Sequence, residues 1–520
     1  MNSEKKKLTR AAGVIGMATL LSRILGFVRD MVIAWFFGAG LLSDAFFVAF
    51  RIPNLLRRLF AEGSLSIAFV PVFTDYLSRD GRAEAFNMAR STLRMLSVIL
   101  VVLTIAGILG APIIVKAIAP GYAGAKFSLT VTLTRIMFPY IFFICLVALS
   151  MGILNTLGHF AAPALAPVFL NVAMIGAVLF IAPHMDSPVT GLAIGVLIGG
   201  ALQLLLQIPF LIKKGFRFWK KASLYHPGLK RIAKLMGPAV FGAAVYQINM
   251  IIATLLASLL PEGSVSYLYY ADRLVQFPLG LFAISLSVAV LPSLSRQAAA
   301  KNFKGLTETF RYAIQLVFFI TLPAMVGLIV LREPIVALLF QRGAFDVEST
   351  RLTAQALVFY SIGLWAVSAV RIVVSTFYSL QDTITPVKIA TVSIIANIIL
   401  GVLLMGPLSH GGLALATSLA SMINFCLLAW ALRKRLGQWD GKKIIESIGK
   451  SVICAIIMGL VLGWLLKFFP LPPAASLTRL LAGVAGGVVA GIAIYGLAAY
   501  ALRCPELNDI RRILRRKPLS

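Results

Sequence analysis

The sequence predicts an all-α polytopic membrane protein with fourteen transmembrane helices. The first observation is composition, since the 520 residues are 59% hydrophobic and only 13% charged. The second is that apolar runs of about 20 residues recur along the whole chain. The third is a long internal repeat. Backbone groups in lipid must find their hydrogen-bond partners within the segment, so such runs form helices.

The predicted spans begin directly after a basic N-terminus, as a signal peptide would. However, Arg23 and Arg29 interrupt the apolar region and no A-x-A cleavage pattern follows, so we expect an uncleaved first span. The fourteen predicted spans, with boundaries soft by several residues, are 11–37, 42–70, 95–118, 129–154, 162–182, 189–212, 235–259, 266–293, 312–332, 352–378, 385–405, 411–433, 447–468 and 478–502.

The distribution of Lys and Arg predicts the orientation. Basic residues gather in the N-terminal tail, in the segment 213–234 and at 511–517, which lie on one side of the membrane if the number of spans is even. Three short loops on the other side contain neither Lys nor Arg: 182–189, 258–266 and 405–412. Both termini are therefore expected in the cytoplasm. The net charge of +29 is explained by this bias, so we expect no nucleic-acid partner.

An internal repeat predicts two lobes. SLSIAFVP at 64–71 recurs as SLSVAVLP at 285–292. Pro112 with Gly121 recurs as Pro334 with Gly343, and the turn before Pro163 recurs before Pro386, all at nearly the same offset. Each copy holds six spans, an even number, so both copies point the same way and a pseudo-two-fold axis should run along the membrane normal. We expect an N-lobe at 1–222, a C-lobe at 223–444, and two C-terminal helices with a cytoplasmic tail at 445–520.

Charged residues inside the first predicted span are the main functional signal. Arg23 lies about 18 Å into this span at 1.5 Å per residue, and Asp30 lies seven residues further on, close to two helical turns. A charge at mid-bilayer costs about 2.5–3.5 kcal/mol on insertion scales. Gly26 between them would allow close approach or bending.

The second span and the second lobe repeat this pattern. In the second span Pro53 cannot donate a backbone hydrogen bond and is a second candidate hinge. In the second lobe, YYADRLVQFP at 269–278 places two charges in a span, and Arg371 follows in a later one. The polar stripe of the second span comprises Asp44, Arg51, Asn54, Arg57, Arg58 and Glu62, and the charges of the second lobe are Asp272 and Arg273.

Three interpretations of these charges remain open. The arginines could pair with the acidic residues and only hold helices together, and Arg57 and Arg58 could extend to the cytoplasmic surface. Ionisable residues within membranes are functional candidates by default. Arginine stays protonated and its fork suits phosphate, so a cavity lined by these residues would favour an anion.

Other chemistry is weakly indicated. Four cysteines lack paired spacing and four histidines lack metal spacing, so we expect no disulfide, no metal site and no cofactor. The sequence contains no Walker loop, HExxH or nucleophile elbow, which argues against an enzyme.

Four segments closely resemble the MurJ (MviN) lipid II flippases of the multidrug/oligosaccharidyl-lipid/polysaccharide exporter superfamily. They are SRILGFVRD at 22–30, SDAFFVAFRIPNLLRRLFAEG at 43–63, YYADRLVQFP at 269–278 and QDTITPVK at 381–388. The resemblance runs over essentially the whole chain in matching order. It implies a transporter of the bacterial inner membrane that translocates lipid II, an undecaprenyl-pyrophosphate-linked peptidoglycan precursor, to the periplasmic leaflet.

The resemblance also implies which residues bind. The family's cavity residues fall on Ser22, Arg23, Arg29, Asp30, Asp44, Asn54, Arg57, Arg58, Glu62, Ser266 and Arg273. It implies alternating access, a groove for the lipid tail at the last two helices, and a contribution of membrane potential. Some family members bind sodium through an aspartate of helix 7, but the matching span here has Gln247 and Asn249 instead, so we do not expect sodium coupling. Asp382 and Asn397 are the remaining candidates.

We expect lipid II and membrane lipids as partners, action as a monomer, and leave association with the cell-wall synthesis machinery open. A flippase for another polyprenyl-pyrophosphate-linked polysaccharide precursor is the main alternative. A multidrug antiporter should have an acidic or aromatic cavity, and an enzyme acting on polyprenyl phosphates should have a carboxylate cluster for a metal. A scaffold for cell-wall proteins would tolerate loss of Arg23 and Arg273.

Overall fold

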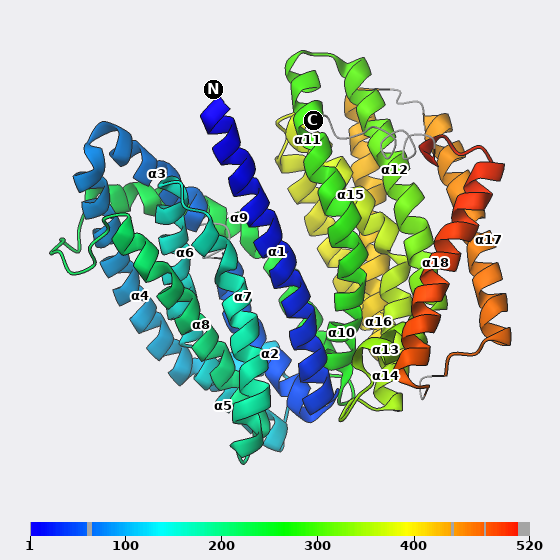
Figure 1. The fold of residues 1–520 in the computed structure, drawn as a ribbon, viewed down its shortest axis with the longest axis horizontal. Coiled ribbons are helices and arrows are strands. Elements are labelled where there is room, and N and C mark those ends of the chain that lie inside the picture. The colour runs from blue at the N-terminus through cyan, green and yellow to red at the C-terminus, as the bar shows by residue number, and fades with distance from the viewer. Residues whose placement is uncertain (1, 60–64, 438–440, 473–474, 508–520) are drawn as a thin grey trace. The chain divides into compact units, whose positions relative to one another are not determined.

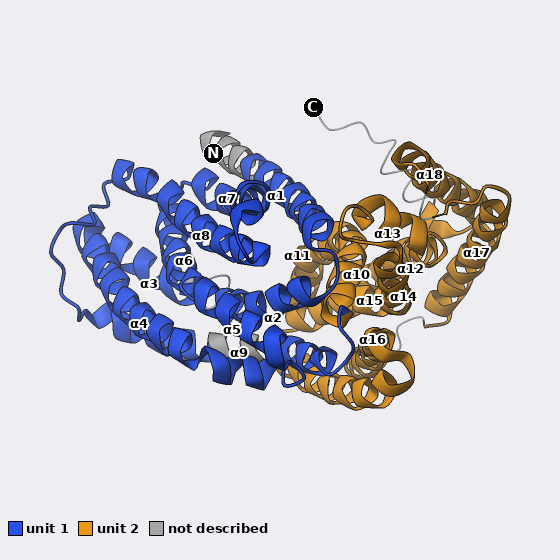
Figure 2. Ribbon diagram, turned by 90° about the horizontal axis from the view of Figure 1, so that it is seen from below, with its two compact units in different colours: residues 1–263 blue, residues 264–520 orange. Residues whose placement is uncertain are grey.

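A computed structural model of the chain describes residues 2–59, 65–437, 441–472 and 475–507. These residues form helices and no strand, which confirms the all-α fold class. The chain divides into two compact units, Met1–Gly263 and Ser264–Ser520 (Figure 2). We describe each unit by itself. The lobe boundaries expected from the repeat, and the symmetry between the lobes, stay predictions.

Unit 1 is a helical bundle in which α1 packs on α7, α2 on α5 and α3 on α9. A π-helical turn and a 3₁₀ turn extend α7 to His184. The helices are α1 Asn2–Phe37, α2 Leu41–Leu56, α3 Leu65–Arg79, α4 Gly81–Ile118, α5 Gly124–Met137, α6 Tyr140–Thr156, α7 Ala161–Gly176, α8 Pro188–Lys213 and α9 Pro227–Ser258 (Figure 1).

Unit 2 is a second helical bundle, in which α12 packs on α15 and α17. A π-helical turn at Leu279–Ile284 joins its first two helices. The helices are α10 Ser264–Pro278, α11 Ser285–Ala299, α12 Phe303–Val330, α13 Arg332–Phe340, α14 Val347–Ile362, α15 Leu364–Ser379, α16 Ile384–Leu436, α17 Gly441–Phe468 and α18 Leu477–Ala501.

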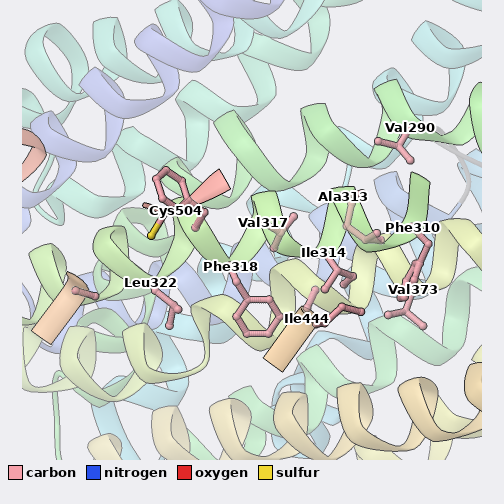
Figure 3. Close-up of a cluster of buried hydrophobic side chains, with 14 of the residues drawn as sticks. Val290, Phe310, Ala313, Ile314, Val317, Phe318, Leu322, Val373, Ile444 and Cys504 are labelled. Carbon is pink, nitrogen blue, oxygen red and sulfur yellow. The ribbon is translucent and has the colours of Figure 1, made fainter. Parts of the chain in front are cut away.

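A continuous apolar cluster holds unit 2 together. Phe310, Val317 and Phe318 of α12 pack with Val373 of α15 and with Cys504 beyond α18 (Figure 3). Since the surrounding lipid is as apolar as these side chains, close packing rather than exclusion of water stabilises such contacts.

Nine helices among the described residues are long and apolar enough to cross a membrane, or up to ten if the pair α14 and α15, bent by 40°, is one span. One of them, α16, has 53 residues, which at 1.5 Å per residue is about 80 Å, more than twice the thickness of the hydrocarbon layer. The chain reverses at Ser409, whose φ is 51°. A Cβ at Gly412 would lie 2.1 Å from the carbonyl oxygen of Leu404, so only glycine fits this turn. The two halves of α16 match the spans predicted at 385–405 and 411–433.

Several predicted boundaries are wrong. The single span expected at 42–70 contains the end of α2 at Leu56 and the start of α3 at Leu65. The span expected at 129–154 lies within Gly124–Thr156, which is one candidate membrane span although a turn at Phe138–Pro139 separates α5 from α6. The helix α13 has no counterpart among the predicted spans. The long helices α4, α9 and α12 begin 8 to 14 residues earlier than predicted, because helix-forming polar residues extend each helix beyond its apolar segment.

Candidate functional site

The charges of α1 include an internal ion pair. Nη2 of Arg29 lies 2.7 Å from Oδ1 of Asp30, and Nε of Arg29 donates to the same oxygen over 3.0 Å. Arg29 is 7% exposed and Asp30 only 1%. This agrees with the structural pairing left open for Arg29, since the carboxylate largely offsets the guanidinium charge within α1.

A single amide connects this ion pair to α7. Nη1 of Arg29 donates to Oδ1 of Asn171 over 3.1 Å, and Nδ2 of Asn171 donates to the carbonyl oxygen of Ser22 over 3.1 Å. Asn171 therefore holds α1 at two places. A Cβ at Gly26 would lie 3.6 Å from the Asn171 amide, an ordinary contact. Because α1 is one uninterrupted helix, the hinge role of Gly26 stays a prediction.

Arg23 differs from Arg29 in its surroundings. Its side chain is exposed, and it makes no ion pair with any residue in the described part of the chain. It lies one residue after Ser22, whose carbonyl Asn171 holds. Arg23 is therefore a cation near the middle of α1 whose backbone is fixed and whose charge can meet a ligand.

The first turn of α2 contains a buried carboxylate, that of Asp44, which pairs with a lysine and accepts a backbone hydrogen bond. Nζ of Lys126 lies 2.7 Å from Oδ2 of Asp44, and the backbone N–H of Gly263 donates to the same oxygen over 2.8 Å. Lys126 also lies over the ring of Tyr122, 4.3 Å from its centroid. The carboxylate at the start of a helix is further stabilised by the helix dipole. Asp44 thus joins α2, the start of α5 and the last residue of unit 1.

The end of α2 is polar and irregular. Nη2 of Arg57 donates to Oδ1 of Asn54 over 2.9 Å, and residues 57–59 form a π-helical turn. The helix continues through Pro53 as far as Leu56, so a hinge at Pro53 stays a prediction. Arg51 and Arg58 are half-buried. Glu62 lies outside the described residues.

In unit 2 the predicted residues lie together on α10. Ser266 is fully buried, and Asp272 and Arg273 are half-buried. Nη2 of Arg273 donates to the hydroxyl of Tyr269 over 2.9 Å, and its guanidinium carbon lies 5.1 Å from the centroid of the same ring. Asp272 accepts a hydrogen bond from Gln276 over 3.0 Å. An aromatic ring one turn away thus orients Arg273.

Arg371, whose orientation the sequence leaves open, is exposed on α15. Its carbonyl oxygen lies 3.5 Å from the hydroxyl of Ser287 on α11, which also lies 2.8 Å from the hydroxyl of Ser375. Arg371 is one of the exposed cations of unit 2.

The sequence analysis missed three partners of the predicted site residues: Lys126 and Asn171 in unit 1, and Tyr269 in unit 2. Asn171 is a polar residue within an apolar run, which was the available signal. A fourth missed residue is Arg135, an exposed cation in α5 whose Nε donates to the carbonyl of Ile108 over 3.3 Å. All four lie in or beside predicted spans.

Asp382 has a structural role at the start of α16. It accepts hydrogen bonds from the backbone N–H and the hydroxyl of Thr385, and Nη1 of Arg435 lies 2.5 Å from it. The backbone hydrogen bond, more than the nearby guanidinium, holds the pKa of Asp382 below its ordinary value. These partners occupy the carboxylate, which disfavours it as a sodium ligand. Within the described ranges, no group of three or more His, Cys, Asp or Glu residues is arranged to hold a metal ion.

Comparison with known proteins gives a consistent result over nearly the full chain. The family model "Lipid II flippase MurJ" matches residues 33–480. A "Probable lipid II flippase MurJ" from Vibrio cholerae is 38% identical over 97% of this chain and 98% of its own. A "Lipid II flippase MurJ" from Burkholderia cenocepacia is 41% identical over 82% and 84%, respectively.

The solved structures agree with the sequence comparison. A "Lipid II flippase MurJ, inward closed conformation" covers 94% of this chain and 99% of its own, with a TM-score of 0.79 and 29% identity. An inward-facing multidrug resistance MATE family transporter of the MOP superfamily has a TM-score of 0.69 over 82% of this chain and 98% of its own, at 18% identity. The second similarity concerns the fold alone.

Proposed function

This chain belongs to the lipid II flippase MurJ family, and from that premise we propose that it translocates lipid II from the cytoplasmic to the periplasmic leaflet for peptidoglycan synthesis. The observation that carries the proposal is the match of residues 33–480 to the family model. The cationic side chains that interrupt its apolar helices suit a pyrophosphate headgroup. The protein is a transporter and not an enzyme.

We assign different roles to the arginines of α1 and α10. Arg23 and Arg273 bind the pyrophosphate, since Arg23 is exposed without an ion pair among the described residues and Tyr269 orients Arg273. Arg29 is a positioning residue, because Asp30 offsets its charge and Asn171 anchors it to α7. This support comes from the contacts within each unit.

The transport cycle is alternating access through a cationic central cavity, with the lipid tail remaining in the bilayer. We propose that membrane potential assists the return of the empty, positively charged cavity, since moving one charge across 100 mV is worth about 2.3 kcal/mol. Collapsing the potential with valinomycin and potassium should slow flipping in reconstituted vesicles. Flipping that is indifferent to the collapse would exclude this coupling. No sodium dependence is expected.

The protein is a membrane protein, and we propose the bacterial inner membrane as its location, with both termini in the cytoplasm. We further propose that the monomer is the functional unit. Association with the cell-wall synthesis machinery can be tested by affinity purification from crosslinked cells.

The proposed function is tested by the leaflet location of lipid II in cells whose only flippase is this protein. A periplasmic enzyme that cleaves exposed lipid II reports surface access. Arg273→Ala is compared with wild type and with Arg296→Ala, which removes an exposed cation at the end of α11. The amount of folded protein is measured in each case.

Exposure in wild type and in Arg296→Ala, but not in stably expressed Arg273→Ala, would support both the substrate and the role of Arg273. Exposure in all three would mean that Arg273 is structural. Exposure in none would overturn the substrate, and a flippase for another polyprenyl-pyrophosphate-linked saccharide would then replace it.

A further inference from the structure

The loop between α8 and α9, residues 214–226, is held along its length by contacts with neighbouring helices of unit 1. Phe216 is fully buried and meets the ring of Phe86 edge to face, with centroids 5.5 Å apart. Arg82 donates to the carbonyl oxygen of Lys214. Arg94 of α4 donates to the carbonyl oxygens of Ala222 and Lys220, the latter over 3.1 Å.

His226 fixes the end of this loop. Its Nδ1 accepts the backbone N–H of Gly228 over 3.0 Å, and its Nε2 lies 2.9 Å from Oε1 of Glu84. Since Nδ1 is an acceptor, Nε2 carries the proton and donates to the carboxylate. The ring also meets Tyr76 edge to face at 5.2 Å. The loop therefore has one defined conformation, held by α3, α4 and α9.

The fixed loop directs aromatic and basic side chains outward. Trp219 is 66% exposed and Tyr225 is 70% exposed. Arg217, Lys220 and Lys221 are exposed beside them. In Figure 1 this loop, drawn in green, extends from unit 1 between the end of α8 and the start of α9. It begins where the apolar segment of α8 ends, which is the depth at which Trp and Tyr concentrate in membrane proteins.

A buried cation lies next to the loop. Arg90 is only 8% exposed, and its Nε is buried without a hydrogen-bond partner among the described residues. It lies four residues before Arg94, so the two side chains share one face of α4, and Arg94 contacts the loop carbonyls. Nε is the only buried nitrogen of Arg90 that lacks an acceptor in the described part of the chain, and the carboxylate of Glu84 on the same helix already interacts with the charge of Arg90. A buried donor without an acceptor is costly, so a further anion at this guanidinium would be favourable.

We infer that the α8–α9 loop and Arg90 form a binding site for the headgroup of an anionic phospholipid of the membrane leaflet. Arg90 donates to the headgroup phosphate, Lys220 and Lys221 add positive charge, and Trp219 and Tyr225 lie among the headgroups and upper acyl chains. The site is distinct from the arginines of α1 and α10, and the inference does not depend on the transported substrate.

The aromatic residues favour a lipid over free phosphate as the source of the anion. Binding of free phosphate does not involve the exposed rings of Trp219 and Tyr225. Binding of a lipid headgroup places both rings at the membrane–water interface, where such rings are favoured. Basic residues near the surface of an anionic membrane are attracted to it within about one Debye length, roughly 10 Å at 0.1 M salt. The combination of a buried cation, exposed cations and exposed aromatic rings fits an anionic lipid.

The test uses the full chain in vesicles of phosphatidylcholine with a minor fraction of phosphatidylglycerol. Lipid composition stays constant, and bromine is placed either on the phosphatidylglycerol or on an equal amount of phosphatidylcholine. The quenching of Trp219 fluorescence is obtained by subtracting the tryptophan fluorescence of Trp219→Phe from that of wild type in each vesicle preparation. At low salt, brominated phosphatidylglycerol should quench Trp219 about two-fold more strongly than brominated phosphatidylcholine.

Variants test whether the preference for phosphatidylglycerol depends on Arg90 and the α8–α9 loop. Arg90→Gln should remove the preference, while Arg296→Gln, an exposed cation of unit 2, should keep it. If Arg90→Gln does not fold, the double variant of the exposed Lys220 and Lys221 to Gln should reduce the preference instead. Equal quenching by both lipids, or no quenching by either, would overturn the inference. A preference that inorganic phosphate abolishes at constant ionic strength would show a free-phosphate site and would also overturn it.

Discussion

Replacing Lys126 by Met should strongly destabilise unit 1, because it removes the lysine that pairs with the buried carboxylate of Asp44. The side chain of Asp44 is 2% exposed and that of Lys126 is 15% exposed, with 2.7 Å between the charged atoms. Removing one partner of a buried ion pair costs about 3–5 kcal/mol. Each kcal/mol shifts the melting temperature by about 2–4 °C for a domain of 150–250 residues, so a loss on the order of 10 °C is expected.

The measurement is thermal unfolding of the detergent-solubilised protein, followed by size-exclusion chromatography. Lys116→Met is the matched control, since it removes an exposed lysine at the end of α4 and should change stability by about 0.5 kcal/mol or less. The double variant Asp44→Asn with Lys126→Met removes both charges. It should be more stable than Lys126→Met alone, because no isolated buried charge remains.

A Lys126→Met protein that melts within about 2 °C of Lys116→Met would refute this reasoning. It would mean that water or the backbone N–H of Gly263 stabilises the carboxylate of Asp44 sufficiently without Lys126. A double variant less stable than Lys126→Met would equally refute it, because Asp44 would then contribute through something other than its charge.

The remaining predictions concern other parts of the chain. Arg23→Gln should abolish flipping with little change in melting temperature, whereas Arg29→Gln should lower the melting temperature by several degrees, measured in parallel on one preparation of each. Because the pKa of Asp382 is lowered in the folded state, wild type should be more stable than Asp382→Asn above a pH of about 4 and lose this advantage as the pH falls through the lowered pKa. Gly121→Ala should cost about 1–3 kcal/mol, since its Cβ would lie 2.2 Å from the last carbonyl oxygen of α9, whereas Gly176→Ala meets nothing within 4 Å and should be tolerated.

Much of the fold could be predicted because membrane helices are specified by local composition. The apolar runs located α7, α8 and the two halves of α16 within a few residues. Boundaries failed where polar helix formers continue a helix beyond its apolar segment, as at Gly81 of α4. Hydropathy alone does not locate such a start, because the residues that extend the helix are not apolar.

The candidate site was predictable in its charges and not in their partners. Asp44 and Arg29 are identifiable because charges are rare within spans. Their partners are 82 and 142 residues away in the chain, at Lys126 and Asn171. Which turn of one helix faces which turn of another is decided by packing, so a single sequence cannot pair them. The interpretation of Arg29 as a partner of Asp30 rather than as a bare cation depends on the 2.7 Å between their charged atoms in the structure.

The contrast between Arg23 and Arg29 suggests why one helix carries both. An isolated cation in a span is costly to insert, but Arg29 and Asp30 enter the membrane as a nearly neutral pair. That pair orients Asn171, and the other end of the same amide holds the carbonyl of Ser22, next to Arg23. Fixing the backbone beside a binding residue reduces the entropy lost when a ligand orders it. We therefore expect the paired Arg29 to support the proposed binding by Arg23 through this shared amide, so that loss of Arg29 weakens lipid II binding as well as stability.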